Sequence, residues 1–149
     1  MNPSNPLDIL VDSTLESLKQ VIPQSFTAKT VLTSPADAAG QVSIEILGDI
    51  EGILLIKEEG NVFKHLAEGM FGMILEGDML QSFIGEFGNM VAGQLATNVS
   101  QKGFRMDITP PHAEGRPELM DRLHCGTLPV ELANGGELHF SFFLKTEAA

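Results

Sequence analysis

The sequence predicts a single α+β domain, with a largely antiparallel sheet of about six strands and helices packed on it. Three observations support this prediction. Stretches with apolar residues at helical spacing alternate with shorter, β-branched runs. Two pairs of those runs are joined by glycine-containing turns, as hairpins are. The order of elements then occurs twice within 149 residues, a length typical of one domain.

The first copy of this order covers residues from about 8 to 58. Apolar residues recur at helical spacing over residues 8–21, and Pro23 ends that helix. Residues 26–33 are rich in β-branched side chains and predict a strand, which is followed by a loop over residues 35–40. Residues 42–47 and 53–57 are apolar runs that flank a turn with a glycine at each end, so they predict a hairpin.

Two helices are predicted between the copies and at the start of the second. Gly60 and Asn61 open a helix over residues 62–75, and Gly77 breaks it. Asp78 is expected to cap the next helix, which runs to about residue 100.

The second copy covers residues from about 78 to 146. After its helix, residues 104–109 alternate as a strand and stop at Pro110 and Pro111. A polar loop follows, and residues 126–132 and 138–144 then flank the turn signal Asn134-Gly135-Gly136. Each copy therefore runs helix, strand, proline, loop and hairpin, which indicates an internal duplication within one domain. Residues 1–7 are expected to be a flexible lead-in.

The composition excludes several classes of function. A formal charge of −11 argues against a nucleic-acid partner, since phosphate backbones are bound by Lys and Arg. The N-terminus has no signal-peptide pattern, and no segment approaches about 18 consecutive apolar residues. A cytoplasmic protein without a membrane span is therefore expected. The lone Cys125 cannot form an internal disulfide, so a packing role is expected for it.

A metal site is not expected. His65 and Glu68 have the i, i+3 spacing of two metal ligands, but no third or fourth ligand has an evident place. We therefore interpret them as a surface pair.

The helix over residues 78–100 carries a polar row. Ser82, Glu86 and Asn89 stand at i, i+4 and i+7, which places them within about 60° of one another on one face. An apolar stripe lies nearly opposite and is expected to pack on the core: Leu80, Ile84, Phe87, Val91 and Leu95. Packing would therefore turn Glu86 and Asn89 outward.

Small residues surround this polar row. Gly85 and Gly93 flank it, and each glycine inside a helix is up to about 1 kcal/mol less favourable than alanine. Such a cost is understandable if a partner must approach the helix closely. Met90, next to Asn89, could reach the same interface.

The motif Ser-x3-Glu-x2-Asn, followed by Met-Val-Ala-Gly and later by Pro110-Pro111, resembles the signature of the CheC/CheX/FliY chemotaxis phosphatases. The resemblance covers residues from about 26 to 144, and the single intact Glu-x-x-Asn looks like CheX. It implies a CheC-like fold and hydrolysis of phospho-aspartate on CheY-like receiver domains. It also implies a homodimer, and Mg²⁺ that is supplied by the receiver, with no cofactor of the chain's own.

The resemblance also assigns roles to residues. Glu86 would accept a charge-assisted hydrogen bond from the receiver's active-site lysine. Asn89 would orient the attacking water, because a carboxamide can donate and accept at once without titrating. Ser82 would support them, and Gly85, Met90 and Gly93 would contact the partner.

The first helix offers a comparison within the chain. Asp12, Glu16 and Lys19 repeat the i, i+4, i+7 spacing, with lysine where the polar row has asparagine. If both helices once carried a site, this one would be a degenerate second site.

Two alternatives remain open. The chain could bind receivers without catalysis. It could also be an assembly domain whose apolar strand over residues 138–144, an edge strand in this hypothesis, pairs with a second copy; Phe140, Phe142 and Phe143 give that strand apolar surface on both faces.

Overall fold

The computed structural model describes residues 5–32, 40–113, 123–133 and 135–145. Most of the two predicted loops and the side chain of Cys125 lie outside these residues. The elements are α1 (Pro6–Val21), β1 (Phe26–Ala28), β2 (Val42–Gly48), β3 (Gly52–Glu59), α2 (Val62–Phe71), α3 (Gly77–Gln101), β4 (Met106–Ile108), β5 (His124–Leu132) and β6 (Glu137–Leu144).

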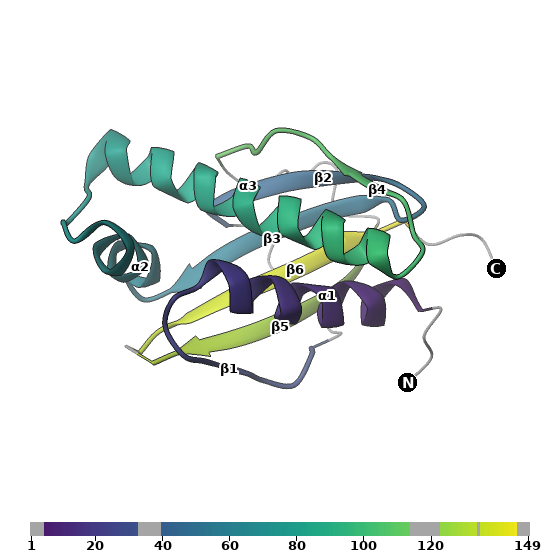
Figure 1. Ribbon diagram of the computed structural model, residues 1–149, viewed down its shortest axis with the longest axis horizontal. Helices are drawn as coiled ribbons and strands as arrows, with labels where there is room; N and C mark the ends of the chain where they lie inside the picture. The colour runs from purple at the N-terminus through teal and green to yellow at the C-terminus, as the bar shows by residue number, and fades with distance from the viewer. Residues whose placement is uncertain (1–4, 33–39, 114–122, 134, 146–149) are drawn as a thin grey trace.

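The predicted α+β architecture is confirmed. Six strands form one sheet in the order β1-β5-β6-β3-β2-β4, and every pairing is antiparallel. The three helices lie on one face of this sheet (Figure 1). Alternate side chains of β3 show the two faces: Leu54 and Ile56 join the large core with the helices, whereas Ile53 and Leu55 pack with Phe143 on the other side.

The strand order has the symmetry that a duplication predicts. Exchanging β1 with β4, β2 with β5, and β3 with β6 reverses the order without otherwise changing it. The register agrees, since Leu55 pairs with Ser141 at the centre of the sheet and the pairing of β1 with β5 mirrors that of β4 with β2. The isolated bridges Leu32–Thr127 and Ser43–His112 are related in the same way.

One consequence corrects the assembly hypothesis. β6, predicted there as an edge strand, is central and is paired with β5 on one side and β3 on the other. It therefore has no free backbone edge for a second copy. Within the described residues the sheet ends at β1 and β4, which are three residues long each. Short edge strands limit pairing with other chains.

The predicted strand over residues 26–33 is shorter than expected. The ladder with β5 stops after Ala28, and pairing resumes only at the Leu32–Thr127 bridge, one residue out of register. Pro129 of β5 explains the interruption: its carbonyl accepts from the Lys29 N–H at 2.9 Å, but proline has no N–H to donate in return.

Three helix boundaries also differ from prediction. α1 begins at Pro6, with the Asn5 side chain accepting from the Leu7 N–H at 2.9 Å, so the lead-in is shorter than residues 1–7. α2 ends at Phe71 rather than residue 75, because Gly72 takes a left-handed conformation with φ 72°. Asp78 is not the cap of α3; Glu76 holds that position, and Asp78 lies in the first turn.

The position of α3 is set by close packing. Ile84, Phe87, Val91 and Leu95 of its apolar stripe are buried as predicted, and Leu80 is partly buried. Gly88 lies so near β2 that a Cβ added there would meet Val42 Cγ2 at 3.0 Å. Near the C-terminal end of the helix, the Asn98 amide donates to Ser17 Oγ of α1 at 2.9 Å, in a buried contact. These contacts leave the opposite face of α3 free.

No helix in the described part of the chain is both long enough and apolar enough to span a membrane.

Candidate active site

The predicted polar row lies in a surface pocket of about 570 Å³. One wall is the outer face of α3, with Gln81, Ser82, Gly85, Glu86 and Asn89. The other wall is the end of β4 and the segment that follows it, with Ile108, Thr109, Pro110 and Pro111. The structure therefore brings the helix motif and the distal prolines, about twenty residues apart in the sequence, to one place.

The second wall is held in place by its neighbours. The Thr109 N–H donates to the Glu45 carbonyl at 3.1 Å, and the Glu45 N–H donates to Thr109 Oγ1 at 3.2 Å. His112 and Ser43 exchange two backbone hydrogen bonds, of 2.8 and 2.9 Å. Pro110 and Pro111 lie between these two anchors and have a fixed φ, so the wall is rigid.

Glu86 and Asn89 are exposed, as predicted, and so is Ser82. Glu86 and Asn89 are one helical turn apart, about 4.5 Å along the helix axis. Within the described ranges no hydrogen bond or ion pair engages any of the three side chains. Their donors and acceptors therefore remain free for a partner.

The predicted contact residues divide into two groups. Gly85 lines the pocket, and a methyl group there would meet no atom within 4 Å. Gly93 is equally open, and Met90 is 36% exposed, but both lie beyond the pocket on the same helix.

Three pocket residues were missed by sequence reasoning: Gln81, Ile108 and Thr109. Gln81 and Thr109 both line the pocket and carry hydrogen-bonding groups. Thr109 was detectable in principle, because it directly precedes the prolines at the end of a predicted strand. Gln81 lies on the flank of the polar row, where sequence alone does not distinguish a pocket residue from a solvated one.

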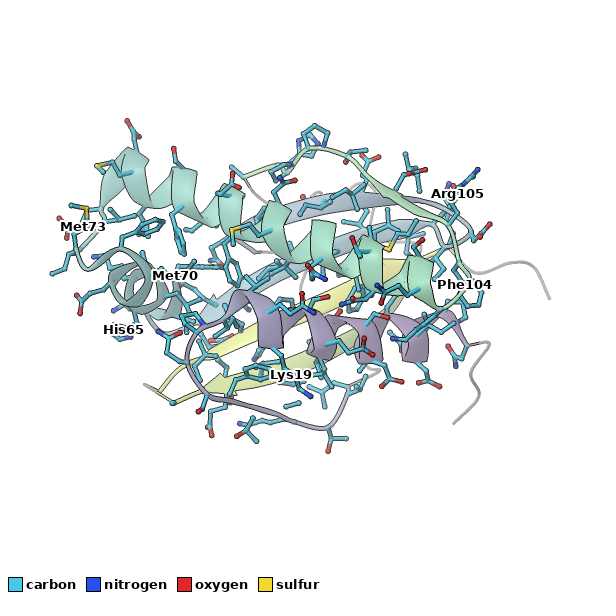
Figure 2. The ribbon with its side chains drawn as sticks, viewed as in Figure 1. Lys19, His65, Met70, Met73, Phe104 and Arg105 are labelled. Atoms are coloured by element: carbon cyan, nitrogen blue, oxygen red, sulfur yellow. The ribbon has the colours of Figure 1, made fainter. Side chains whose placement is uncertain are left out.

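The comparison with the first helix needs correction. α1 ends at Val21 and β1 begins at Phe26, just as α3 ends at Gln101 and β4 begins at Met106. This spacing aligns Asp12, Glu16 and Lys19 with the C-terminal half of α3, not with the segment from Ser82 to Asn89. Glu16 binds Lys102 Nζ at 3.0 Å. Figure 2 shows Lys19 on α1, away from α3.

The other candidate cluster gains no support as a metal site. His65 and Glu68 are exposed on α2. Among the described residues, no group of three or more His, Cys, Asp or Glu side chains could hold a metal ion.

Comparisons with known proteins agree with this geometry. Residues 41–116 match the model of a family described as chemotaxis phosphatase CheX. The chain is also 30% identical over 148 residues to the CheY-P phosphatase CheX of Thermotoga maritima, covering 95% of this chain and 96% of that protein. The chain belongs to the CheX family.

Solved structures of the CheX and CheC-like group share the fold. A chain in the CheX–CheY–BeF3–Mg²⁺ complex from Borrelia burgdorferi superposes with a TM-score of 0.73 at 18% identity, covering 95% of this chain and 99% of that one. A CheC-like superfamily protein from Shewanella sp. PV-4 gives a TM-score of 0.72 at 22% identity, with the same coverage. The CheX fold of this chain is thus supported by sequence and by structure.

Proposed function

We propose that this CheX-family protein hydrolyses the phospho-aspartate of a CheY-like receiver domain, as a chemotaxis phosphatase in the cytoplasm. The observation that supports the proposal most is the shared pocket: Glu86 and Asn89 stand free on α3 and face the rigid Thr109–Pro111 segment. The Thermotoga relative is named a CheY-P phosphatase, and the Borrelia structure is a CheX–CheY complex.

The chemistry needs little from the phosphatase. Water attacks the phosphorus, the new P–O bond forms, and the bond to the aspartate oxygen breaks, releasing inorganic phosphate and the free carboxylate. An acyl phosphate already has a good leaving group, so the main requirement is a water placed in line with that bond. Glutamine positions water in a similar way in regulatory GTPases.

Asn89 suits this task, since its carboxamide can accept from the water and donate to a phosphoryl oxygen. Glu86, one turn earlier, would accept from the receiver's lysine and so fix the position of the two proteins. Ser82 would support Glu86 or the partner loop, while Gly85 and Gly93 would let the partner's backbone approach. In this proposal the receiver supplies the Mg²⁺ bound at its phosphoryl group, and this chain supplies no cofactor.

The test is the decay of a phosphorylated receiver. Asn89→Ala should slow the accelerated decay by roughly a hundredfold, because the water is no longer held in line. Glu86→Gln should mainly weaken binding, because it removes the charge that pairs with the lysine. Gln101→Ala and Glu68→Gln, exposed side chains outside the pocket, are matched controls and should retain wild-type activity.

Two results would overturn the catalytic proposal. One is a wild-type protein that accelerates the decay of no CheY-like receiver. The other is an Asn89→Ala variant as active as wild type. Capture of receivers at an unchanged decay rate would instead identify a non-catalytic receiver-binding module.

A further inference from the structure

Exposed apolar side chains gather at one end of the molecule. Seven large apolar side chains are exposed within the described residues, and four of them lie where α2 joins α3: Phe71 at 58%, Met73 at 54%, Ile74 at 66% and Met79 at 61%. We call these four residues the apolar tip. Figure 2 shows Met73 at this corner, at the opposite end of the molecule from Phe104 and Arg105.

The apolar tip is firmly attached to the helix that carries the site. The Phe71 ring packs edge-on against Phe83 at 5.8 Å between centroids, and Phe83 contacts Phe87 at 6.1 Å. Leu75, within the same connection, is only 7% exposed and belongs to the core. Lys64 of α2 also binds Glu76 at 3.4 Å. The tip therefore has a fixed position relative to Ser82, the neighbour of Phe83.

The tip continues the outer face of α3. Met79 precedes Glu86 by seven residues, which is two turns of the helix, about 10 Å along its axis and about 20° around it. A typical stable interface buries about 800 Å² on each partner, which corresponds to a patch about 16 Å in radius. A partner centred on Glu86 and Asn89 would therefore also cover Met79.

Apart from the proposed pairing of Glu86 with the receiver's lysine, charge does not favour binding of the phospho-receiver here. Gly77–Gln101 contains two acidic residues, Asp78 and Glu86, and no Lys or Arg, while the whole chain carries a formal charge of −11. A phospho-aspartate site is also anionic, so long-range electrostatics would oppose the encounter. Affinity must then come from local contacts, and exposed aromatic and Met side chains are typical of interface centres.

We propose that the apolar tip is a second docking surface for the receiver domain, which adds affinity to that of the proposed Glu86–lysine pair, while Asn89 provides the chemistry. This inference rests on the proposed function, because it names a further contact of the same partner. It commits to the receiver, rather than a second copy of this chain, because Met79 of the tip lies on the same outer face of α3 as Glu86.

The test separates affinity from turnover. Ile74→Ser combined with Met79→Ser removes two side chains that are 66% and 61% exposed and lie outside the core, so the fold should be retained. The double variant should raise the KM for a phosphorylated CheY-like receiver, and the Kd for the same receiver loaded with BeF3 and Mg²⁺, by roughly tenfold, with kcat unchanged. Leu32→Ser combined with Leu47→Ser removes two exposed side chains outside the tip, 51% and 43% exposed, and should change neither constant.

The outcomes distinguish this inference from the proposed function. If wild type binds the BeF3-loaded receiver but does not accelerate hydrolysis, the phosphatase proposal fails, while a raised Kd in the tip variant still supports the docking surface. Equal KM and Kd in wild type and tip variant overturn the docking surface even if Asn89→Ala abolishes turnover. A tip variant that changes only the self-association of the free protein, measured by light scattering, identifies the tip as a contact between copies and also overturns the inference. A wild-type protein that neither binds nor dephosphorylates any receiver overturns both.

Discussion

Two glycines of α3, one turn apart, should respond in opposite ways to the same substitution. A Cβ at Gly85 would meet no atom within 4 Å, so Gly85→Ala adds only a methyl group on the surface of the pocket. Alanine is about 1 kcal/mol more favourable than glycine inside a helix. Gly85→Ala should therefore stabilise the fold by up to about 1 kcal/mol, which corresponds to about 2–4 °C in Tm for a domain of this size.

Gly88→Ala should destabilise the fold. The added Cβ would lie 3.0 Å from Val42 Cγ2 and 3.1 Å from Val42 Cγ1, in the packed layer between α3 and β2. Val42 is 1% exposed and belongs to the core, so it would have to shift within a close-packed layer to admit the Cβ. Overpacking of this kind opposes folding by about 1–3 kcal/mol, which outweighs the gain of about 1 kcal/mol from helix propensity.

The assay has two readouts. Urea unfolding gives the free energy of unfolding for each variant, and receiver decay gives the turnover. Gly93→Ala is the matched control, because Gly93 is also open but lies outside the pocket. Gly85→Ala and Gly93→Ala should stabilise alike, and Gly85→Ala should lose more turnover. The reasoning is refuted if Gly85→Ala lowers the free energy of unfolding, or if Gly88→Ala raises it as much as Gly85→Ala does.

Two further predictions concern residues away from the site. Thr14 is buried and its hydroxyl has no hydrogen-bond partner in the described structure, so Thr14→Val should raise the free energy of unfolding in urea by about 1 kcal/mol; a loss of stability would contradict this. The Lys29 ammonium, hydrogen-bonded to the Glu137 carboxylate, lowers the pKa of that carboxyl, with a smaller contribution from His139. The pair therefore supports folding above the ordinary carboxyl range and loses that support as the pH falls through the lowered pKa. Lys29→Met should raise the pKa of Glu137 in an NMR titration, and an unchanged titration would disprove the pairing in solution.

Local features of the fold were predictable because they depend on neighbours in the chain. The apolar stripe of α3 repeats with the period of a helix and is buried as expected, except for the partly buried Leu80. Gly135 and Gly136 have φ values of 86° and 82°. A glycine pair between two apolar runs predicts this left-handed conformation, because hairpin turns require positive φ. Helix boundaries were less predictable: Asp78 is a preferred N-cap type, but Glu76 holds that position without a side-chain cap hydrogen bond.

The arrangement of strands was less accessible. The Phe-rich strand β6 was placed at an edge in one hypothesis, but a strand that is apolar on both faces is typical of the centre of a sheet. The shortening of β1 depends on Pro129, about a hundred residues later, so no local pattern of β1 could reveal it.

The sequence by itself determined that Ser82, Glu86 and Asn89 share the face of α3 that points away from the core, because helical periodicity is a local property of the chain. Only the tertiary structure decided what faces them. The register of β4 on β2 brings Thr109, Pro110 and Pro111 opposite this row, and the junction of α2 with α3 leaves the apolar tip exposed beside it. Both follow from contacts between distant segments, whose geometry depends on the packing of the whole domain.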